Sequence, residues 1–337
     1  MIHQSDRRAN GRIVAPDADG LRRATELLRS GSVCAFPTET VYGLGADAFS
    51  ARAVAEIYRL KNRPVWNPLI VHVYSATHAE ALARVWPDAA AALAERYWPG
   101  PLTLVVERAG HLPASGGADT ATIAIRVPAH PVARDLLEAC ELPLAAPSAN
   151  RSESISPTRA EHVIRSLPEV PLVLDGGPCD FGIESTVVDV TAGRVTLLRP
   201  GALGLRSIRD VVGRVDLPDA PIGAPAGVRS PGTGARHYAP AAPLVIVESI
   251  TEQSLEGLRR PIGILTHEDP MQVNLAGRVE LLSADPREYA ADLYAALHRL
   301  DDAKVSTIVA LAPPADDDWL AVNDRLSRAA AKPGRAC

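Results

Sequence analysis

The sequence predicts an α/β protein of two domains: a larger one on a mixed, twisted sheet with flanking helices, and a smaller Rossmann-like one at the C-terminus. A chain of 337 residues is longer than one typical hydrophobic core accommodates. Strand and helix patterns interleave along it without the strict alternation of a barrel. A stretch rich in proline and glycine separates two such regions. We therefore expect domains at residues 12–215 and 244–331, joined by a semi-extended linker over residues 216–243.

Local signals define the helix expected after Ser50. Ser50 is a good N-cap, and the residues behind it place apolar side chains on one helix face. The helix must end before Pro64, because the residue before a proline disfavours helical backbone. Lys61 and Arg63 are therefore expected at or just past its C-terminal end, free to point into a cleft.

The other elements of the larger domain follow from the same periodicities and from the turn residues between them. The expected strands are residues 33–36, 69–73, 102–107, 121–127, 172–174, 186–190 and 194–198. The expected helices are residues 21–29, 79–98, 130–140, 158–166 and 207–212. Thr158 and Glu161 have the spacing of a capping box that opens a helix. Gly43 and Gly45 are expected in a turn that allows a close approach of the backbone.

The smaller domain is predicted from a second alternation of strand and helix patterns after the linker. The expected strands are residues 244–248, 262–265, 279–282 and 305–311, and the expected helices are residues 286–301 and 319–330.

Composition excludes several classes of protein. With 47% hydrophobic and 22% charged residues, the chain is an ordinary globular protein rather than a disordered one. A net charge of -5 argues against wrapping of nucleic acid. Scattered cysteines, and the lack of a long apolar run or a signal sequence, indicate a cytoplasmic protein without membrane contact. The histidines show no metal-ligand spacing, so we expect no dedicated metal site.

The segment from Phe36 to Val73 gathers the groups that an anionic small molecule requires. It contains hydroxyls, two cations one residue apart, the amide of Asn67 and the imidazole of His72. Two fixed cations beside an amide suit a triphosphate, although cations at a helix C-terminus also favour the macrodipole. His72 lies among apolar strand residues, where a satisfied core histidine is the alternative. The chain has no Gly-Lys dipeptide and hence no Walker motif, so ATP would bind in another manner.

Further polar residues at strand ends have two interpretations each. Thr122 and Arg126 face one side of an apolar strand, and Arg126 needs either a substrate carboxylate or an internal acidic partner. Ser148 lies among small residues that end a strand, and Ser156 follows at a helix N-terminus, where backbone N–H groups and hydroxyls bind phosphate or simply cap the helix. Arg199 closes a strand before Pro-Gly and reaches either a phosphate or the surface.

Seven short motifs occur together over residues 21–212: PTETVYGLGA, KNRPVWNPLIVH, WPGPLTL, APSAN, SPT, ESTVVD and LRPG. In order and spacing they resemble the signature of the threonylcarbamoyl-AMP synthases, the YrdC-like enzymes of tRNA modification. The SPG and HYAP motifs of the linker and the trailing α/β region are similar to the long, two-domain form. The resemblance therefore implies a YrdC-like fold for the larger domain.

The resemblance also implies a reaction: L-threonine, bicarbonate and ATP give threonylcarbamoyl-AMP and pyrophosphate. The implied L-threonine contacts are Thr40, His72, Arg126, Ala146 and Ser185. The implied ATP contacts are Lys61, Arg63, Asn67, Thr122, Ser148, Ser156, Arg199 and Tyr238. Lys61 and Arg63 would act catalytically by stabilising charge, with Mg²⁺ carried by ATP rather than by the protein. The product would pass to a tRNA threonylcarbamoyltransferase, with RNA contact as a further possibility.

Two other functions are open to the same fold. One is an RNA-binding accessory protein, which the retained threonine positions disfavour. The other uses carbamoyl phosphate, but such proteins carry extra zinc-finger-like cysteines that this chain lacks. The linker has Thr233-Gly234-Ala235 where the family commonly has Met-Lys-Tyr, which puts its contacts in doubt. We expect residues 225–240 to form a lid over the cleft that orders when ATP and threonine bind.

Overall fold

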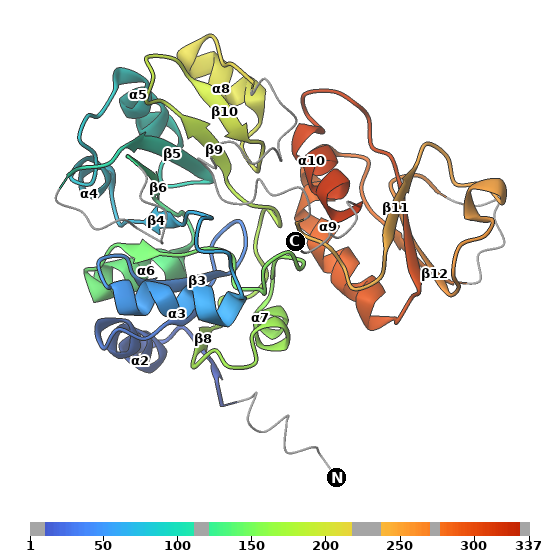
Figure 1. The fold of residues 1–337 in the computed structure, drawn as a ribbon, viewed down its shortest axis with the longest axis horizontal. Helices are drawn as coiled ribbons and strands as arrows, with labels where there is room; N and C mark the ends of the chain where they lie inside the picture. Colours follow the sequence, from blue (N-terminus) through green and yellow to red (C-terminus); the bar gives the residue numbers. More distant parts are fainter. Residues whose placement is uncertain (1–10, 111–120, 218–236, 270–276, 331–337) are drawn as a thin grey trace.

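The protein is described here from a computed structural model that covers residues 11–110, 121–217, 237–269 and 277–330 (Figure 1). These residues form two sheets. The larger has ten strands in the order β1-β8-β2-β3-β7-β4-β6-β5-β9-β10, and the smaller has four in the order β11-β14-β12-β13. The larger sheet mixes parallel and antiparallel pairs, whereas every pair of the smaller sheet is parallel. The predicted fold class is confirmed, while the domain boundaries and the linker stay a prediction.

The strands of the larger sheet are β1 (Ile13–Val14), β2 (Cys34–Phe36), β3 (Gly43–Asp47), β4 (Ile70–His72), β5 (Leu102–Glu107), β6 (Thr122–Arg126), β7 (Leu144–Ala145), β8 (Val173–Leu174), β9 (Thr186–Asp189) and β10 (Thr196–Arg199). Its helices are α2 (Ala18–Arg29), α3 (Ala51–Lys61), α4 (Ala76–Glu80), α5 (Asp88–Tyr97), α6 (Pro131–Cys140), α7 (Ala160–Ser166) and α8 (Leu205–Val212). The C-terminal domain contains β11 (Leu244–Val247), the short helix η1 (Gln253–Leu255), β12 (Ile262–Thr266), β13 (Gly277–Leu281), α9 (Pro286–Asp302), β14 (Thr307–Leu311) and α10 (Leu320–Ala330).

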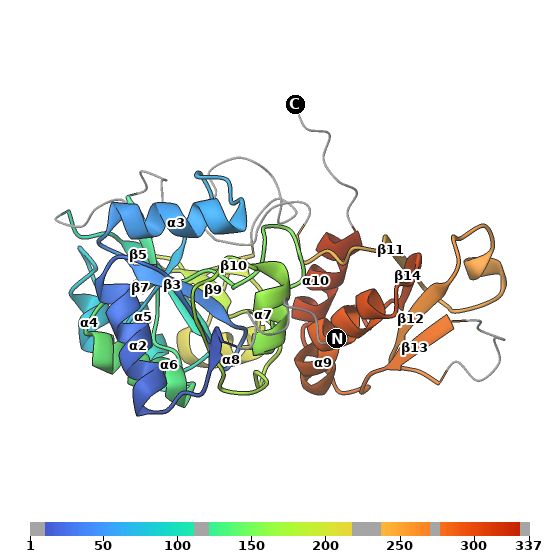
Figure 2. The same ribbon diagram turned by 90° about the horizontal axis from the view of Figure 1, so that it is seen from below.

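Alternation along β2 explains how helices cover both faces of the larger sheet. Cys34 and Phe36 pack with α2 and α6, whereas Ala35 belongs to the core cluster that contains the buried face of α3. Figure 2 shows α3 on one side of the sheet, with α2 and α6 on the other.

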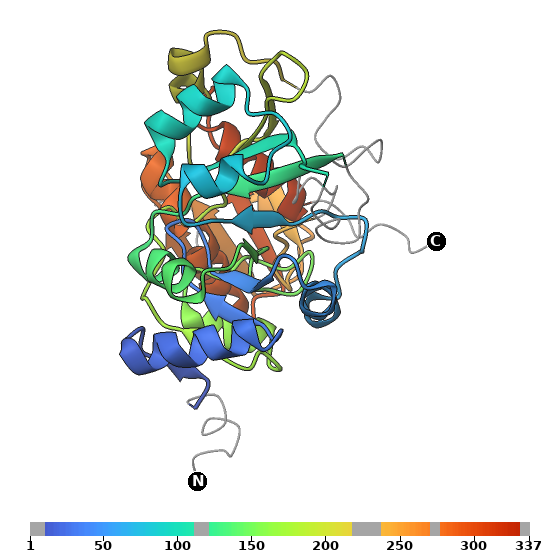
Figure 3. The same cartoon turned by 90° about the vertical axis from the view of Figure 1, so that its left-hand side faces the viewer.

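The C-terminal domain meets the larger domain through its helices. Both α9 and α10 lie between the four-stranded sheet and the larger domain (Figure 1), and Figure 3 shows the C-terminal domain behind the larger one. One close approach is at Gly182, where an added Cβ would overlap the carbonyl oxygen of Ala291 in α9. Because its φ of +66° also favours glycine, Gly182 meets two requirements at once.

Three local predictions were wrong. Gly43 and Gly45 lie in strand β3 rather than in a turn, and a Cβ on Gly45 would approach Phe36 Cε1 to 2.7 Å. Residues 79–98 are not one helix, because the chain leaves α4 and pairs at Ala83 with Arg108 before α5 begins. Helix α7 begins at Ala160, with Arg159 as its N-cap and no side-chain cap, so the predicted capping box does not form.

Candidate active site

A pocket opens where the loops of the larger domain meet the C-terminal end of the predicted linker. It is lined by Thr38, Thr40, Val41, Gly43, Arg63, Ile70, His72, Arg126, Ala146, Pro147, Ser148, Glu184, Ser185, Arg199, His237 and Tyr238. Strand pairing brings several of these residues together. The parallel strands β4 and β6 pair His72 with Arg126, and an isolated bridge joins Gly43 to Ser148.

Arg126 is buried and has an internal acidic partner. Its Nη2 lies 2.7 Å from Glu39 Oε1, and both side chains are at most 4% exposed. Its Nη1 donates to Thr40 Oγ1 over 2.8 Å, and its Nε donates to the carbonyl oxygen of Gly100. Of the two partners that the sequence left open, the structure therefore contains the internal carboxylate. A substrate carboxylate at Arg126 would be an additional partner.

His72 is a neutral imidazole beside that arginine. Burial, and secondly the charge of Arg126, lower the pKa of His72 to about 3. Its Nδ1 has no hydrogen-bond partner among the residues that the structure describes. A neutral ring nitrogen at the pocket wall can donate to or accept from a ligand without adding charge.

Arg63 is oriented by the loop that follows it. Asn62 ends α3 with a left-handed C-cap, which turns the chain back toward the pocket. Arg63 Nη2 then donates to Asn67 Oδ1 over 2.6 Å and to the carbonyl oxygen of Pro68 over 2.8 Å. Burial lowers the pKa of Arg63 to about 10, so its guanidinium stays charged at neutral pH. Asn67 does not itself line the pocket; it holds Arg63 at the pocket wall.

Lys61 differs from the expectation that it projects freely. It is 1% exposed, and its Nζ donates to the backbone carbonyls of Ser148 and Asn150. Burial, and secondly the nearby charge of Arg63, lower the pKa of Lys61 well below its usual range. In this structure Lys61 anchors the loop that carries Ser148, and it is not among the residues that line the pocket.

Glu184 is a pocket residue to which the sequence analysis assigned no role. Its Oε1 accepts from Ser156 over 2.6 Å, and its Oε2 accepts from Tyr294 and Arg325 over 3.0 and 2.8 Å. Burial raises the pKa of Glu184, but Arg325, Arg199 and the bond from Ser156 outweigh it, and the pKa falls to about 2. A lone carboxylate beside small residues and hydroxyls was the available signal, since a buried acid requires partners.

Arg199 and Ser185 form a second polar group on the same wall. Arg199 Nε and Nη2 donate to the carbonyl oxygen of Ser185, and Nη2 also lies 3.2 Å from Ser185 Oγ. Ser185 Oγ is in turn 2.8 Å from Thr103 Oγ1. The guanidinium is therefore fixed at the end of β10, buried rather than at the surface.

Tyr238 is the end of the predicted linker that reaches the pocket. Its ring is 1% exposed, packs against Tyr294 with centroids 5.6 Å apart, and has the Arg325 guanidinium 4.9 Å from its centroid. The backbone of Tyr238 has a φ of +60°, and Ala239 bonds to Glu153. Residues 225–236 of the expected lid lie outside the described residues, so the lid stays a prediction.

Nine of the predicted site residues line this pocket: Thr40, Arg63, His72, Arg126, Ala146, Ser148, Ser185, Arg199 and Tyr238. Four do not: Lys61, Asn67, Thr122 and Ser156. Thr122 begins β6, four residues before Arg126 on the same strand face. The other three bond to residues of the wall, so they stand one layer behind it.

Comparison with known proteins finds relatives that match over most of the chain. A family model described as telomere recombination, Sua5_yciO_yrdC, matches residues 26–201, and a second, described as the threonylcarbamoyl-AMP synthase C-terminal domain, matches residues 204–331. The threonylcarbamoyl-AMP synthase of Pyrococcus abyssi is 40% identical over 92% of this chain and 93% of its own length. That of Bacillus subtilis is 40% identical over 92% of both chains.

A solved structure extends the similarity to three dimensions. The crystal structure of Pyrococcus abyssi Sua5 complexed with L-threonine matches with a TM-score of 0.84 and 38% identity, over 92% of this chain and 94% of that one. The chain therefore belongs to the Sua5/YciO/YrdC family of ATP-using nucleotidyltransferases. Within that family it is one of the two-domain threonylcarbamoyl-AMP synthases.

Proposed function

We propose that this pocket binds L-threonine and ATP side by side and joins them through bicarbonate. The observation that carries the proposal is the set of three buried arginines, Arg63, Arg126 and Arg199, around one pocket that also contains a neutral histidine. The carboxylate of threonine and the triphosphate of ATP are two separate anionic groups, and each requires its own cations in the pocket wall.

Arg126 and Thr40 would hold the threonine carboxylate. Arg126 is fixed by Glu39 and Gly100, so its guanidinium is oriented before a ligand arrives. His72, on the neighbouring strand, would contact the threonine amine or hydroxyl through a neutral nitrogen. Ser185 and the small side chain of Ala146 would complete the threonine site.

Arg63, Arg199 and Ser148 would face the triphosphate. Asn67, Ser156, Thr122 and Lys61 would support this part of the site from behind, and Tyr238 would cover the nucleotide. The described residues contain no group of three His, Cys, Asp or Glu side chains that could hold a metal ion. Both oxygens of Glu184 already accept hydrogen bonds. Mg²⁺ would reach the site with ATP, as part of the MgATP substrate.

The reaction needs positioning and charge stabilisation rather than a protein nucleophile. The threonine amine condenses with bicarbonate to a carbamate and releases water. A carbamate oxygen then attacks the α-phosphorus. The bond between the α-phosphorus and the oxygen that bridges it to the β-phosphorus breaks, and pyrophosphate leaves. Negative charge grows on the phosphate oxygens in this step, where Arg63 and Arg199 would stabilise it.

The product would serve threonylcarbamoyladenosine formation on tRNA, through a tRNA threonylcarbamoyltransferase as the partner. Bicarbonate as a substrate, RNA contact and a cytoplasmic location belong to the same proposal. Within the described residues, no helix is both long and apolar enough to cross a bilayer. No observation favours the RNA-binding accessory function over synthesis.

The test is pyrophosphate release from MgATP, with L-threonine and bicarbonate each omitted in turn. We expect release to require both. Arg126→Lys keeps the charge but loses the forked geometry, so it is expected to raise the KM for threonine more than the KM for ATP. Equal release without threonine would overturn the proposal.

A further inference from the structure

The C-terminal domain contributes two side chains that reach the pocket wall. Tyr294 of α9 and Arg325 of α10 both bond to Glu184 Oε2, which belongs to the larger domain. Figures 1 and 2 show that these two helices are the part of the C-terminal domain that faces the larger one. Arg325 is fully buried at this junction, and Glu184 is 8% exposed.

Arg325 fits its surroundings in a way that a simpler cation could not. Its Nε bonds to Glu184, its Nη2 donates to the carbonyl oxygen of Pro200 over 3.0 Å, and its Nη1 pairs with Asp324. One guanidinium therefore ties the segments before β9 and after β10 to α10. Only the planar fork of arginine makes these three contacts together.

The same two residues also hold the linker end that lines the pocket. The Tyr238 ring lies against Tyr294 on one side and near the Arg325 guanidinium on another. Glu184 in turn accepts a hydrogen bond from the hydroxyl of Ser156, so the position of Ser156 also depends on Glu184. Glu184 and Tyr238 in the pocket wall, and Ser156 one layer behind it, thus depend on side chains from α9 and α10.

We propose that Arg325 and Tyr294 are positioning residues of the synthase site, so that the C-terminal domain completes the pocket rather than merely adjoining it. The inference rests on the proposed function, because it concerns residues assigned there to ATP. Ser156 and Tyr238 belong to that set, and Arg199 is among the groups that lower the pKa of Glu184. Loss of these contacts is therefore expected to weaken the binding of ATP more than the binding of threonine.

The test compares three variants of the full chain. Arg325→Lys keeps the positive charge beside Glu184 but loses the fork, and Tyr294→Phe removes one hydroxyl without changing the ring. Arg209→Lys is the matched control, because Arg209 also pairs across the domains, with Asp317 over 2.8 Å, on the partly exposed surface. The readouts are the KM values for ATP and threonine, ATP binding by calorimetry, and the melting temperature.

We expect Arg325→Lys to raise the KM for ATP by about tenfold and Tyr294→Phe by roughly threefold, as loss of hydrogen bonds to a charged group implies. Arg209→Lys should leave both KM values unchanged. A lower melting temperature with a normal KM for ATP in both test variants would overturn the inference, since the contacts would then be structural only. If Arg325→Lys does not fold, Tyr294→Phe decides alone.

Failure of the proposed function gives a different result. In that case the unaltered protein releases pyrophosphate without threonine, whereas calorimetry still measures how each variant binds ATP. Glu184→Gln combined with Arg325→Lys adds an internal check. The two changes should be non-additive in ATP affinity if they act through one contact, and additive affinities would contradict the inference.

Discussion

At the scale of single residues, the orientation of Arg63 depends on a contact four residues away. The side chain amide of Asn67 and two backbone carbonyls fix the guanidinium, so little rotational freedom remains to be lost when a phosphate binds. Arg59, in the last turn of α3 and four residues before Arg63, pairs with Glu56 and Glu169 at the surface instead. Of the two arginines, only the one in the loop after α3 lines the pocket.

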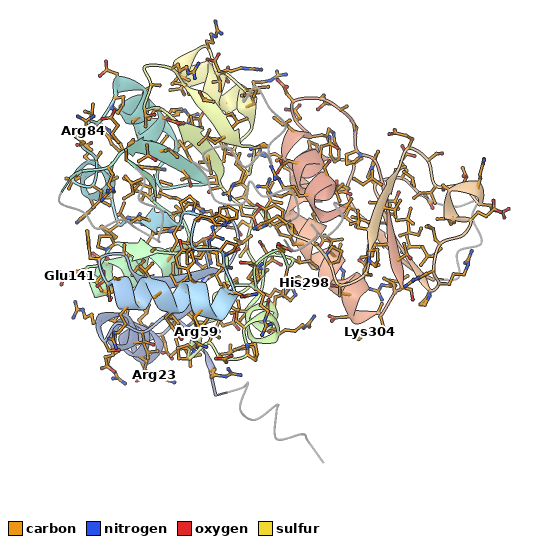
Figure 4. All side chains as sticks on the ribbon, in the orientation of Figure 1. Arg23, Arg59, Arg84, Glu141, His298 and Lys304 are labelled. Carbon is orange, nitrogen blue, oxygen red and sulfur yellow. The ribbon has the colours of Figure 1, made fainter. Side chains whose placement is uncertain are left out.

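Arg63→Ala is expected to weaken ATP binding by roughly 1.5–3 kcal/mol, the usual loss for a charge-assisted hydrogen bond. The fold should survive, because Asn67 and the carbonyls can bond to water that enters the pocket. Arg59→Ala, labelled in Figure 4, is the control and should bind ATP normally. Calorimetry with MgATP provides the measurement, and an unchanged affinity in Arg63→Ala would show that no phosphate contacts this cation.

At the scale of elements, sequence periodicity predicted helices more reliably than the pairing of short strands. The 3.6-residue pattern predicted α3 and α9 closely, because it is local. Strand β3 was missed because its two glycines are accommodated by antiparallel pairing with β2 and β7, which no local pattern reveals. The Glu184–Arg325 contact joins residues 141 positions apart, so the sequence could not relate them.

A pair of histidines links α7 to α9 across the domain junction. The rings of His162 and His298 stack with centroids 3.8 Å apart, and His298 is labelled on α9 in Figure 4. Burial lowers the pKa of His162 to about 3, with the charge of His298 as the second cause, and burial lowers the pKa of His298 to about 4. Both rings are therefore neutral in the folded protein at neutral pH.

This stack predicts a loss of stability in mild acid. Between the unfolded pKa of about 6.5 and the lowered folded values, the unfolded chain binds more protons, so the free energy of unfolding falls as the pH falls. His162→Phe keeps a stacked ring but removes one titrating group. Melting temperatures from pH 7.5 down to pH 4.5 should then decline less steeply than in the unaltered protein.

The exposed His78 supplies the control for that series. Its ring bonds to Ser75 at the surface, so His78→Phe should leave the slope unchanged. An unchanged slope in His162→Phe would mean that the stacked pair does not contribute to the acid sensitivity. His72 and His237 also have lowered pKa values, so some acid sensitivity is expected to remain in either variant.

At the scale of the whole molecule, the absence of a side chain at Gly182 allows the two domains to approach closely at this point. Gly182 lies against α9 two residues before Glu184 in the chain. A methyl group there would push on the backbone of Ala291, which cannot move without α9. Domain contact and the position of Glu184 are therefore coupled through a short segment of backbone.

Gly182→Ala is expected to destabilise the protein by about 2–4 kcal/mol, combining backbone strain at positive φ with overpacking. Gly193→Ala is a matched control, because Gly193 has a φ of +67° and nothing within 4 Å of its would-be Cβ. It should cost only about 1 kcal/mol from backbone strain. Denaturant unfolding measures both, and equal losses would show that the contact with α9 can relax.

The loop that carries Arg63 and Asn67 also exposes Trp66, which is 54% accessible. Trp86 and Trp98 pack against each other, and Trp319 is 5% exposed, so Trp66 is the tryptophan most open to water. Its indole would emit at longer wavelength than a buried one and meet a soluble quencher first. The protein thus carries a fluorophore one residue from Asn67, sensitive to the loop that would hold the nucleotide, without any chemical label.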